Sequence, residues 1–134
     1  MVRFTLLFLV AFPIGCASSD RIAPVVIPTD GANTDYVEFL PQLRSLAWRT
    51  TEAFYRDRWD ELDEAAQTLD RAIKVLPQSK NIPQRLQADL PARCTVISEE
   101  CAKLRQASRE RSAAAASDHL QKIHVAIREL RSEP

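Results

Sequence analysis

Four stripes of apolar residues, each repeating at intervals of three and four positions, run through residues 35–131 of this chain. This spacing places the apolar side chains on one face of an α-helix, and no segment shows the strict alternation of a half-buried strand. The stripes are Tyr36, Leu40, Leu43, Ala47, Thr50 and Phe54; Trp59, Leu62, Ala66, Leu69, Ile73 and Leu76; Leu90, Cys94, Ile97, Cys101 and Leu104; and Ala116, Leu120, Ile123, Ile127 and Leu130. Because each stripe must be covered by another element, the sequence predicts an all-α fold, an antiparallel four-helix bundle over 35–131.

The residues between the stripes indicate where the helices begin and end. Asp35 followed by Glu38 has the pattern of a capping box, so the first helix is expected to begin there. Pro41 is expected to kink this helix or to move its start to about Leu40. The clearest internal loop is 77–83, where two prolines enclose a polar stretch. The residues expected to fill the centre of the bundle are Leu69, Ile97, Leu120, Ile123 and Ile127.

The number of helices depends on whether the chain turns near 56–58 and 109–112. Neither segment contains glycine or proline, so two long helices in a hairpin, over 35–76 and 92–131, are the alternative. Helices of about 40 residues would be roughly 60 Å long and would need a partner to cover their faces. Asp57 and Ser112 are suitable N-caps for a following helix, which favours turns at both places.

The chain starts with a basic residue, Arg3, followed by a largely apolar run from Phe4 to Ile14. A helix that spans a bilayer needs roughly 20 apolar residues, whereas the core of a signal peptide needs about 7–15. The run therefore predicts a signal peptide over 1–15. The segment 16–34 contains Pro24 and Pro28 and no sustained periodicity, so we expect a tether between the signal and the bundle.

The end of the signal, Gly15-Cys16, resembles the lipobox of bacterial lipoproteins, in which a small residue precedes the cysteine that is lipidated. Pro13 departs from that pattern, because the family usually has an aliphatic residue there. The resemblance implies lipidation of Cys16, and two acyl chains would hold the protein stably on a membrane in the periplasm or outer envelope. The alternatives are an ordinary cleaved secretory peptide and an uncleaved hydrophobic anchor.

Composition excludes several classes of function. Eighteen basic and eighteen acidic side chains give zero net charge, so no basic field exists to attract nucleic acid. The chain has two glycines and neither of the glycine-rich motifs that bind nucleotide phosphates. The segment Ser117-Asp118-His119 holds the residue types of a hydrolase, but contiguous helical residues point in different directions. The sequence therefore predicts no catalytic site and no enzyme activity.

Cys94 and Cys101 lie on one face of the predicted third helix. Seven residues separate them, or about 10.5 Å along the axis, which exceeds the roughly 7 Å limit between the Cα atoms of a disulfide. We expect both to be small apolar core residues. The alternative is a thiol that binds a metal or crosslinks two copies of the chain.

Two segments resemble the bundles of cytochrome c-prime and soluble cytochrome b. They are AKLRQASRERSAAAASDHLQKIHVAIRELR at 102–131 and AFYRDRWDELDEAAQTLDRAIKVL at 53–76. This resemblance implies a four-helix bundle related to haem proteins. The c-type members carry CxxCH near their C-terminus, and here its two cysteines and histidine fall on Ile123, Ala126 and Ile127, which exclude covalent haem. The b-type members use a methionine of the first helix, and the single methionine of this chain is Met1.

The two histidines, His119 and His124, are candidate ligands. His124 lies one residue from the core stripe, and we expect it at the boundary between core and solvent; the alternative is a lone axial ligand of noncovalent haem. His119 lies about 140° around the helix from it, so the pair cannot share a metal ion. Glu99 and Glu100 are expected on a solvated helix face. The sequence therefore predicts no metal site.

We therefore expect an exported, lipid-anchored and non-catalytic helical module that binds or supports a partner at the cell envelope. Its partners would be the membrane, through the lipid on Cys16, and an unknown protein or a second copy of the chain. The alternative is an electron-transfer or gas-binding protein that holds haem noncovalently through His124.

Overall fold

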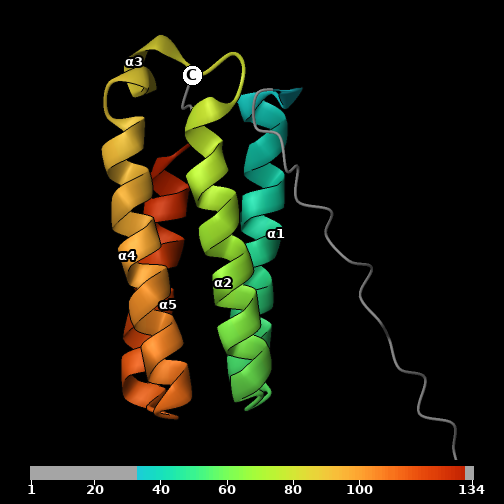
Figure 1. The fold of residues 1–134 in the computed structure, drawn as a ribbon, viewed down its shortest axis with the longest axis vertical. Coiled ribbons are helices and arrows are strands. Elements are labelled where there is room, and N and C mark those ends of the chain that lie inside the picture. The colour runs from blue at the N-terminus through green and yellow to red at the C-terminus, as the bar shows by residue number, and fades with distance from the viewer. Residues whose placement is uncertain (1–32, 132–134) are drawn as a thin grey trace, which may run out of the picture.

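The computed structural model describes residues 33–131 and is all-α in this range, as predicted (Figure 1). Its helices are α1 (Tyr36–Tyr55), α2 (Trp59–Val75), α3 (Gln84–Gln87), α4 (Leu90–Arg109) and α5 (Ala113–Glu129), with a 3₁₀ turn η2 (Leu76–Gln78) after α2. The predicted signal peptide, the lipidation site Cys16 and most of the tether lie outside the described residues.

The four long helices lie side by side, and successive long helices run in opposite directions (Figure 1). Helix α2 packs closely against α1 and α4, and α4 packs closely against α5. Helix α5 contacts α1 only loosely. The seam between the first and last long helices is therefore the most open of these packed pairs.

One continuous core holds the helices together. Phe54 and Trp59 are partly buried, and every other member of the four predicted stripes is buried. The residues predicted to fill the centre are buried, as predicted: Leu69, Ile97, Leu120, Ile123 and Ile127. Burial of a Leu or Ile side chain contributes about 1.5–3 kcal/mol, so these stripes are the main source of stability.

The first helix begins at Tyr36, as predicted, but without the expected capping box. Asp35 is its N-cap and makes no side-chain cap hydrogen bond. The Asp35 carboxylate instead accepts a 2.6 Å hydrogen bond from the Nδ2 group of Asn81. A later start at Leu40 is wrong, because α1 continues through Pro41.

The chain enters the fold slightly before the predicted boundary. The backbone N–H of Tyr36 donates to the carbonyl of Lys80 at 2.9 Å, and the N–H of Lys80 donates to the carbonyl of Thr34 at 3.0 Å. Thr34, expected to be the last tether residue, is thus paired with the loop after α2. The short helix α3 within 84–87 was not predicted.

The turn between α1 and α2 has the hydrogen bonds of a Schellman motif. The N–H of Arg58 donates to the carbonyl of Ala53 at 2.9 Å, and that of Asp57 donates to Phe54 at 3.0 Å. Asp57 takes the left-handed conformation that glycine usually occupies at this position, with φ 56°.

The turn between α4 and α5 repeats this arrangement. The N–H of Ser112 donates to Ala107 at 2.9 Å, that of Arg111 donates to Ser108 at 3.0 Å, and Arg111 has φ 50°. The alternative of two long helices in a hairpin is therefore wrong. The chain turns at both places without glycine, because Asp57 and Arg111 adopt the left-handed conformation.

Candidate functional site

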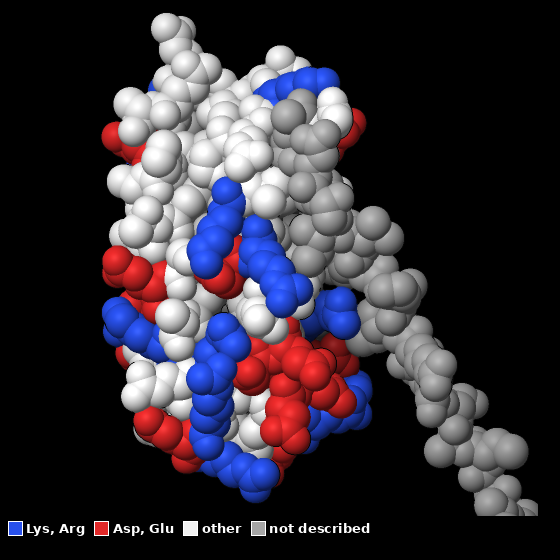
Figure 2. Space-filling model, viewed as in Figure 1, with Lys and Arg blue, Asp and Glu red and all other residues white. Residues whose placement is uncertain are grey.

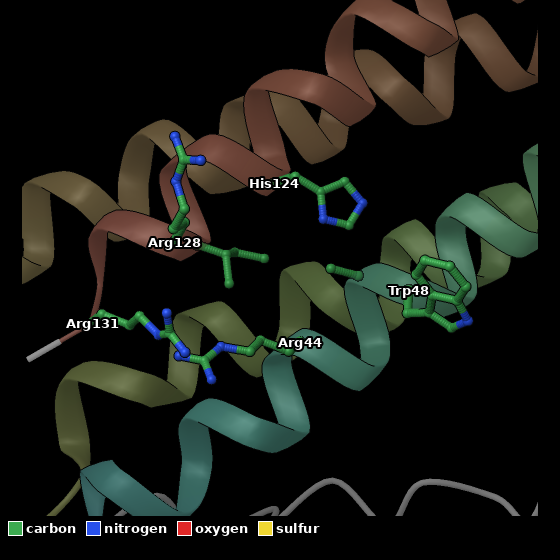
Figure 3. A pocket seen from close by; sticks show the side chains of 7 residues that line it. Arg44, Trp48, His124, Arg128 and Arg131 are labelled. Atoms are coloured by element: carbon green, nitrogen blue, oxygen red, sulfur yellow. The ribbon is translucent and has the colours of Figure 1, made fainter.

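A surface groove of about 350 Å³ lies along the loosely packed seam between α1 and α5 (Figure 3). It is lined by Arg44, Ala47 and Trp48 from α1, by His124, Ile127 and Arg128 from α5, and by Arg131 just after α5. Ile127 belongs to the core and forms part of the floor of the groove. The rim is thus basic and aromatic, while the floor is apolar.

Helical periodicity brings these side chains together. Arg44, Trp48 and Thr51 are spaced by four and three residues on α1. His124, Arg128 and Arg131 have the same spacing at the end of the chain. Such spacing places each set on one helical face, and the two faces meet across the seam.

The three arginines of the groove have no ion pair with a carboxylate of residues 33–131. Glu129, which follows Arg128 in sequence, lies 3.7 Å from Arg93, and Glu52 of α1 pairs with Arg56 at 2.8 Å. The guanidinium groups of Arg44 and Arg131 point toward one another (Figure 3), and a bound anion would relieve the repulsion between them.

The opposite situation holds on the face of the molecule shown in Figure 2. There, Lys and Arg side chains lie beside Asp and Glu, and the end around α3 is mostly uncharged. Between α2 and α4, the carboxylate of Asp63 accepts a 3.0 Å hydrogen bond from the Nε group of Arg105. Pairing of this kind neutralises surface charge, whereas the arginines of the groove have no carboxylate partner among the described residues.

His124 points from α5 towards α1 (Figure 3). Its Nε2 atom lies 2.6 Å from the hydroxyl oxygen of Thr51, and that hydroxyl is also 3.2 Å from the carbonyl of Ala47. A hydroxyl has a single hydrogen, so when Thr51 donates to Ala47, Nε2–H of His124 donates to Thr51. The Nδ1 atom is then left without its proton in the neutral ring. Burial lowers the pKa of His124 below its usual 6.5.

Trp48 supplies an aromatic surface at the edge of the groove. Its side chain is 64% exposed, which is unusual for a large apolar group. Val37 and Tyr55 are also exposed and lie eleven residues before and seven residues after it on α1. The outer face of α1 therefore offers apolar contacts that continue from the groove in both directions.

His119 and Glu100, considered separately in the sequence, form a pair between α5 and α4. The Nδ1 atom of His119 lies 2.8 Å from a carboxylate oxygen of Glu100, and the other oxygen accepts from Lys103 at 2.7 Å. The prediction of a solvated Glu100 is wrong, since Glu100 is buried, whereas Glu99 is exposed. Burial opposes the charge of Glu100, but the hydrogen bonds from Lys103 and His119 outweigh it and lower its pKa.

The two cysteines of the third stripe are buried and free, as predicted for core residues. Burial raises the pKa of Cys94 to about 11. Burial, with the nearby charges of Asp70 and Glu100, raises the pKa of Cys101 to about 12. Thiols with such pKa values stay protonated at neutral pH, which disfavours metal binding and nucleophilic chemistry.

A second groove of about 420 Å³ lies near Cys94, beside Pro77 and Pro91. Its basic residue, Lys74, is paired with Asp70 at 2.7 Å. Its other charged residue is the acidic Glu99, so this groove does not offer the set of basic side chains found in the α1–α5 groove.

The positions that would carry covalent haem belong to the core rather than to a haem pocket. Ile123 and Ile127 are buried, and Ala126 is packed against the core. These residues do not fit a covalently attached haem, and side chains fill the space at the centre of the helices. Among residues 33–131, no group of three or more possible metal ligands comes together.

No helix within the described range is both long and apolar enough to cross a membrane. No protein-family model, curated protein or solved structure matches the chain.

Proposed function

We propose that this protein is a non-catalytic binding module whose α1–α5 groove takes an anionic ligand. The observation that carries the proposal is the set of three guanidinium groups, Arg44, Arg128 and Arg131, that line the groove without a carboxylate partner in the described range. Arginine presents a rigid fork of donors suited to oxyanions. The exposed indole of Trp48 at the rim supports a ligand that also has an apolar part.

We further propose that the helices form an antiparallel four-helix bundle of the cytochrome c-prime type without covalent haem. The order of packing contacts, α1 with α2, α2 with α4 and α4 with α5, supports this arrangement. The bundle would be exported and held at the envelope by a lipid on Cys16, with an unknown protein or a second copy as a further partner. The apolar run Phe4–Ile14 and the dipeptide Gly15-Cys16 support this location.

The ligand proposal is tested by thermal unfolding of the full chain with small organic anions. Benzoate and phenyl phosphate are expected to raise the midpoint temperature of unfolding, whereas neutral benzamide is expected to leave it unchanged. Only an anion can neutralise the positive charge of the arginines and so bind the folded protein. Arg44→Gln and Arg131→Gln are expected to abolish the increase. Arg71→Gln is the matched control, since Arg71 is an exposed arginine of α2 away from the groove. An equal response in all three variants would contradict the proposal.

The location is tested by metabolic labelling with a radioactive fatty acid in a bacterial host. The wild-type chain is expected to take up label and sediment with membranes, and Cys16→Ser is expected to lose the label. Label that persists in Cys16→Ser would show that another residue is acylated and would contradict the proposed anchor.

The alternative function is electron transfer or gas binding with noncovalent haem on His124. The observation that favours it is that His124 lies on the same groove as the three arginines, which could meet the carboxylates of a porphyrin. Hemin added to the full chain would then give a Soret band that disappears in His124→Ala and persists in His119→Ala. Absence of the band in the wild-type chain would exclude this alternative.

A further inference from the structure

We infer that the ligand of the α1–α5 groove is a phosphomonoester whose organic part is aromatic or apolar. This inference rests on the proposed function and deepens it, because it names the anionic group and what is attached to it. Three features of the groove carry it: the number of unpaired arginines, the position of His124 and the exposed ring of Trp48.

The arginines favour an anion with more charge than one carboxylate. Arg44 comes from α1 and Arg131 from the residues after α5, and these two side chains point toward one another, so donors come from two sides, whereas Arg128 points away from both (Figure 3). A carboxylate brings a single charge and two oxygens in one plane, which suits one arginine fork. A phosphomonoester brings a charge of about −1.5 to −2 at pH 7 and three terminal oxygens arranged around phosphorus. It can accept from both sides of the groove at once.

His124 can change its protonation state when an anionic ligand binds. In the free protein its Nε2 atom is engaged with Thr51, and burial lowers its pKa, which favours the neutral ring. The charged residues that line the groove with it, Arg44 on α1 and Arg128 and Arg131 on its own side, are all cationic, so none of them favours its protonation. The negative charge of a bound dianion outweighs this positive charge and favours the protonated form of His124. His124 would then take up a proton and donate through Nδ1 as well as Nε2.

Trp48 provides the contact for the organic part of the ligand. Its indole is 64% exposed and lines the groove one helical turn along α1 from Arg44, at the other end of the groove from Arg131 (Figure 3). Stacking on an exposed tryptophan removes apolar surface from water and tolerates many apolar partners. The same chemistry exists in soluble aryl or acyl phosphates and in phosphatidic acid at a membrane surface.

The experiment uses the fluorescence of Trp48 in the full chain carrying Trp59→Phe. The sequence has two tryptophans, and Trp59→Phe keeps an aromatic ring beside Phe54 while leaving Trp48 as the sole indole. Phenyl phosphate is expected to bind at least about tenfold more tightly than benzoate or inorganic phosphate, since each lost favourable contact of about 1.4 kcal/mol is a tenfold change. Arg44→Gln and Arg131→Gln are expected to weaken binding of phenyl phosphate at least about tenfold, and Arg71→Gln to change it less than about twofold.

Proton NMR of the imidazole rings provides the second measurement. The pKa of His124 is expected to rise when phenyl phosphate binds, and that of His119 is expected to stay constant, because His119 faces Glu100 rather than the groove. A His124 resonance that titrates identically with and without phenyl phosphate would overturn the part of the inference that concerns His124.

A third measurement distinguishes a soluble aryl or acyl phosphate from phosphatidic acid in a membrane as the source of the phosphomonoester. Cosedimentation of the full chain with phosphatidylcholine vesicles is compared with and without added phosphatidic acid. A gain from phosphatidic acid that depends on Arg44, with weak binding of phenyl phosphate, supports a lipid source, whereas tight binding of phenyl phosphate supports a soluble one.

Two negative results have different meanings. If benzoate binds as tightly as phenyl phosphate, and binding of both depends on Arg44, the assignment of the ligand as a phosphomonoester is wrong. The proposed function as an anion-binding module is then still supported. If neither ligand nor the phosphatidic acid vesicles bind in an Arg44-dependent way, the inference and the proposed function both fail. Circular dichroism of each variant before the titrations ensures that a loss of binding does not reflect unfolding.

Discussion

The hydroxyl of Tyr36, at the start of α1, donates a 2.6 Å hydrogen bond to the carbonyl of Leu130, which follows α5. Both residues are completely buried. Burial raises the pKa of Tyr36 to about 12, so the phenol stays protonated and remains a donor over the physiological range. This bond closes the end of the seam at which the described chain both begins and ends.

Tyr36→Phe is expected to destabilise the protein by about 1–3 kcal/mol, because it leaves the buried carbonyl of Leu130 without its donor. Urea unfolding followed by circular dichroism measures the difference. Tyr55→Phe is the control, since Tyr55 is 80% exposed, and it is expected to leave the free energy of unfolding unchanged. Equal effects of the two substitutions would show that the hydrogen bond to Leu130 does not stabilise the fold.

Glu100→Gln is expected to cost about 1–3 kcal/mol at pH 7, because the buried carboxylate loses charge-assisted hydrogen bonds to Lys103 and His119. Glu99→Gln is the matched change at an exposed neighbouring residue, and it is expected to change the free energy of unfolding little. The pKa of Glu100 is lowered on folding, so its charged form stabilises the protein above the usual pKa of 4.5. The difference between wild type and Glu100→Gln should shrink as the pH falls below that value, and a difference that is constant down to the folded pKa would contradict this assignment.

Stability is also expected to depend on His124. Its pKa is lowered on folding, so the unfolded chain takes up a proton at higher pH than the folded protein does. The stabilisation is complete above 6.5, the usual pKa, and is lost as the pH falls from there through the folded pKa. Wild type should therefore lose more stability than His124→Gln over this interval, as measured by urea unfolding. Both proteins retain His119, so any contribution of His119 to the free energy of unfolding is the same in both and cancels in the difference.

Arg111→Gly is expected to stabilise the protein by about 1 kcal/mol, because glycine adopts the left-handed conformation without the steric cost of a Cβ atom. Asp57→Gly makes the same change in the turn between α1 and α2, where the gain should be smaller, since aspartate tolerates this conformation better than arginine does. Thermal unfolding of both variants checks the order. A larger gain at Asp57 would show that interactions other than backbone strain control these turns.

The helices were predictable because their periodicity is local information. The spacing of Leu62, Leu69 and Ile73, for example, needs no knowledge of the neighbouring helix, and all three are buried. The turns were harder to place, because Asp57 and Arg111 occupy a conformation that sequence patterns associate with glycine. The capping box failed for a different reason: the carboxylate of Asp35 has a competing partner, Asn81, in a loop 46 residues away.

The site was not predictable from single segments. The spacing of Arg44 with Trp48, and of His124 with Arg128, is visible in the sequence. It does not show that the two pairs line one groove, because the groove forms only where α1 and α5 lie together. Glu100 shows the same limitation, since its burial depends on His119 from the following helix. Side chains that act across two helices are found from the three-dimensional arrangement, and an unpaired arginine on a helix looks like any other surface residue until its surroundings are known.

The bond between Tyr36 and Leu130 also makes the entrance and the exit of the helical domain neighbours in space. A short peptide joining them, with new ends opened between Asp57 and Arg58, would give a circularly permuted chain with every long helix in its present place. The order in which the helices are synthesised can therefore be changed without moving the two faces that form the arginine groove.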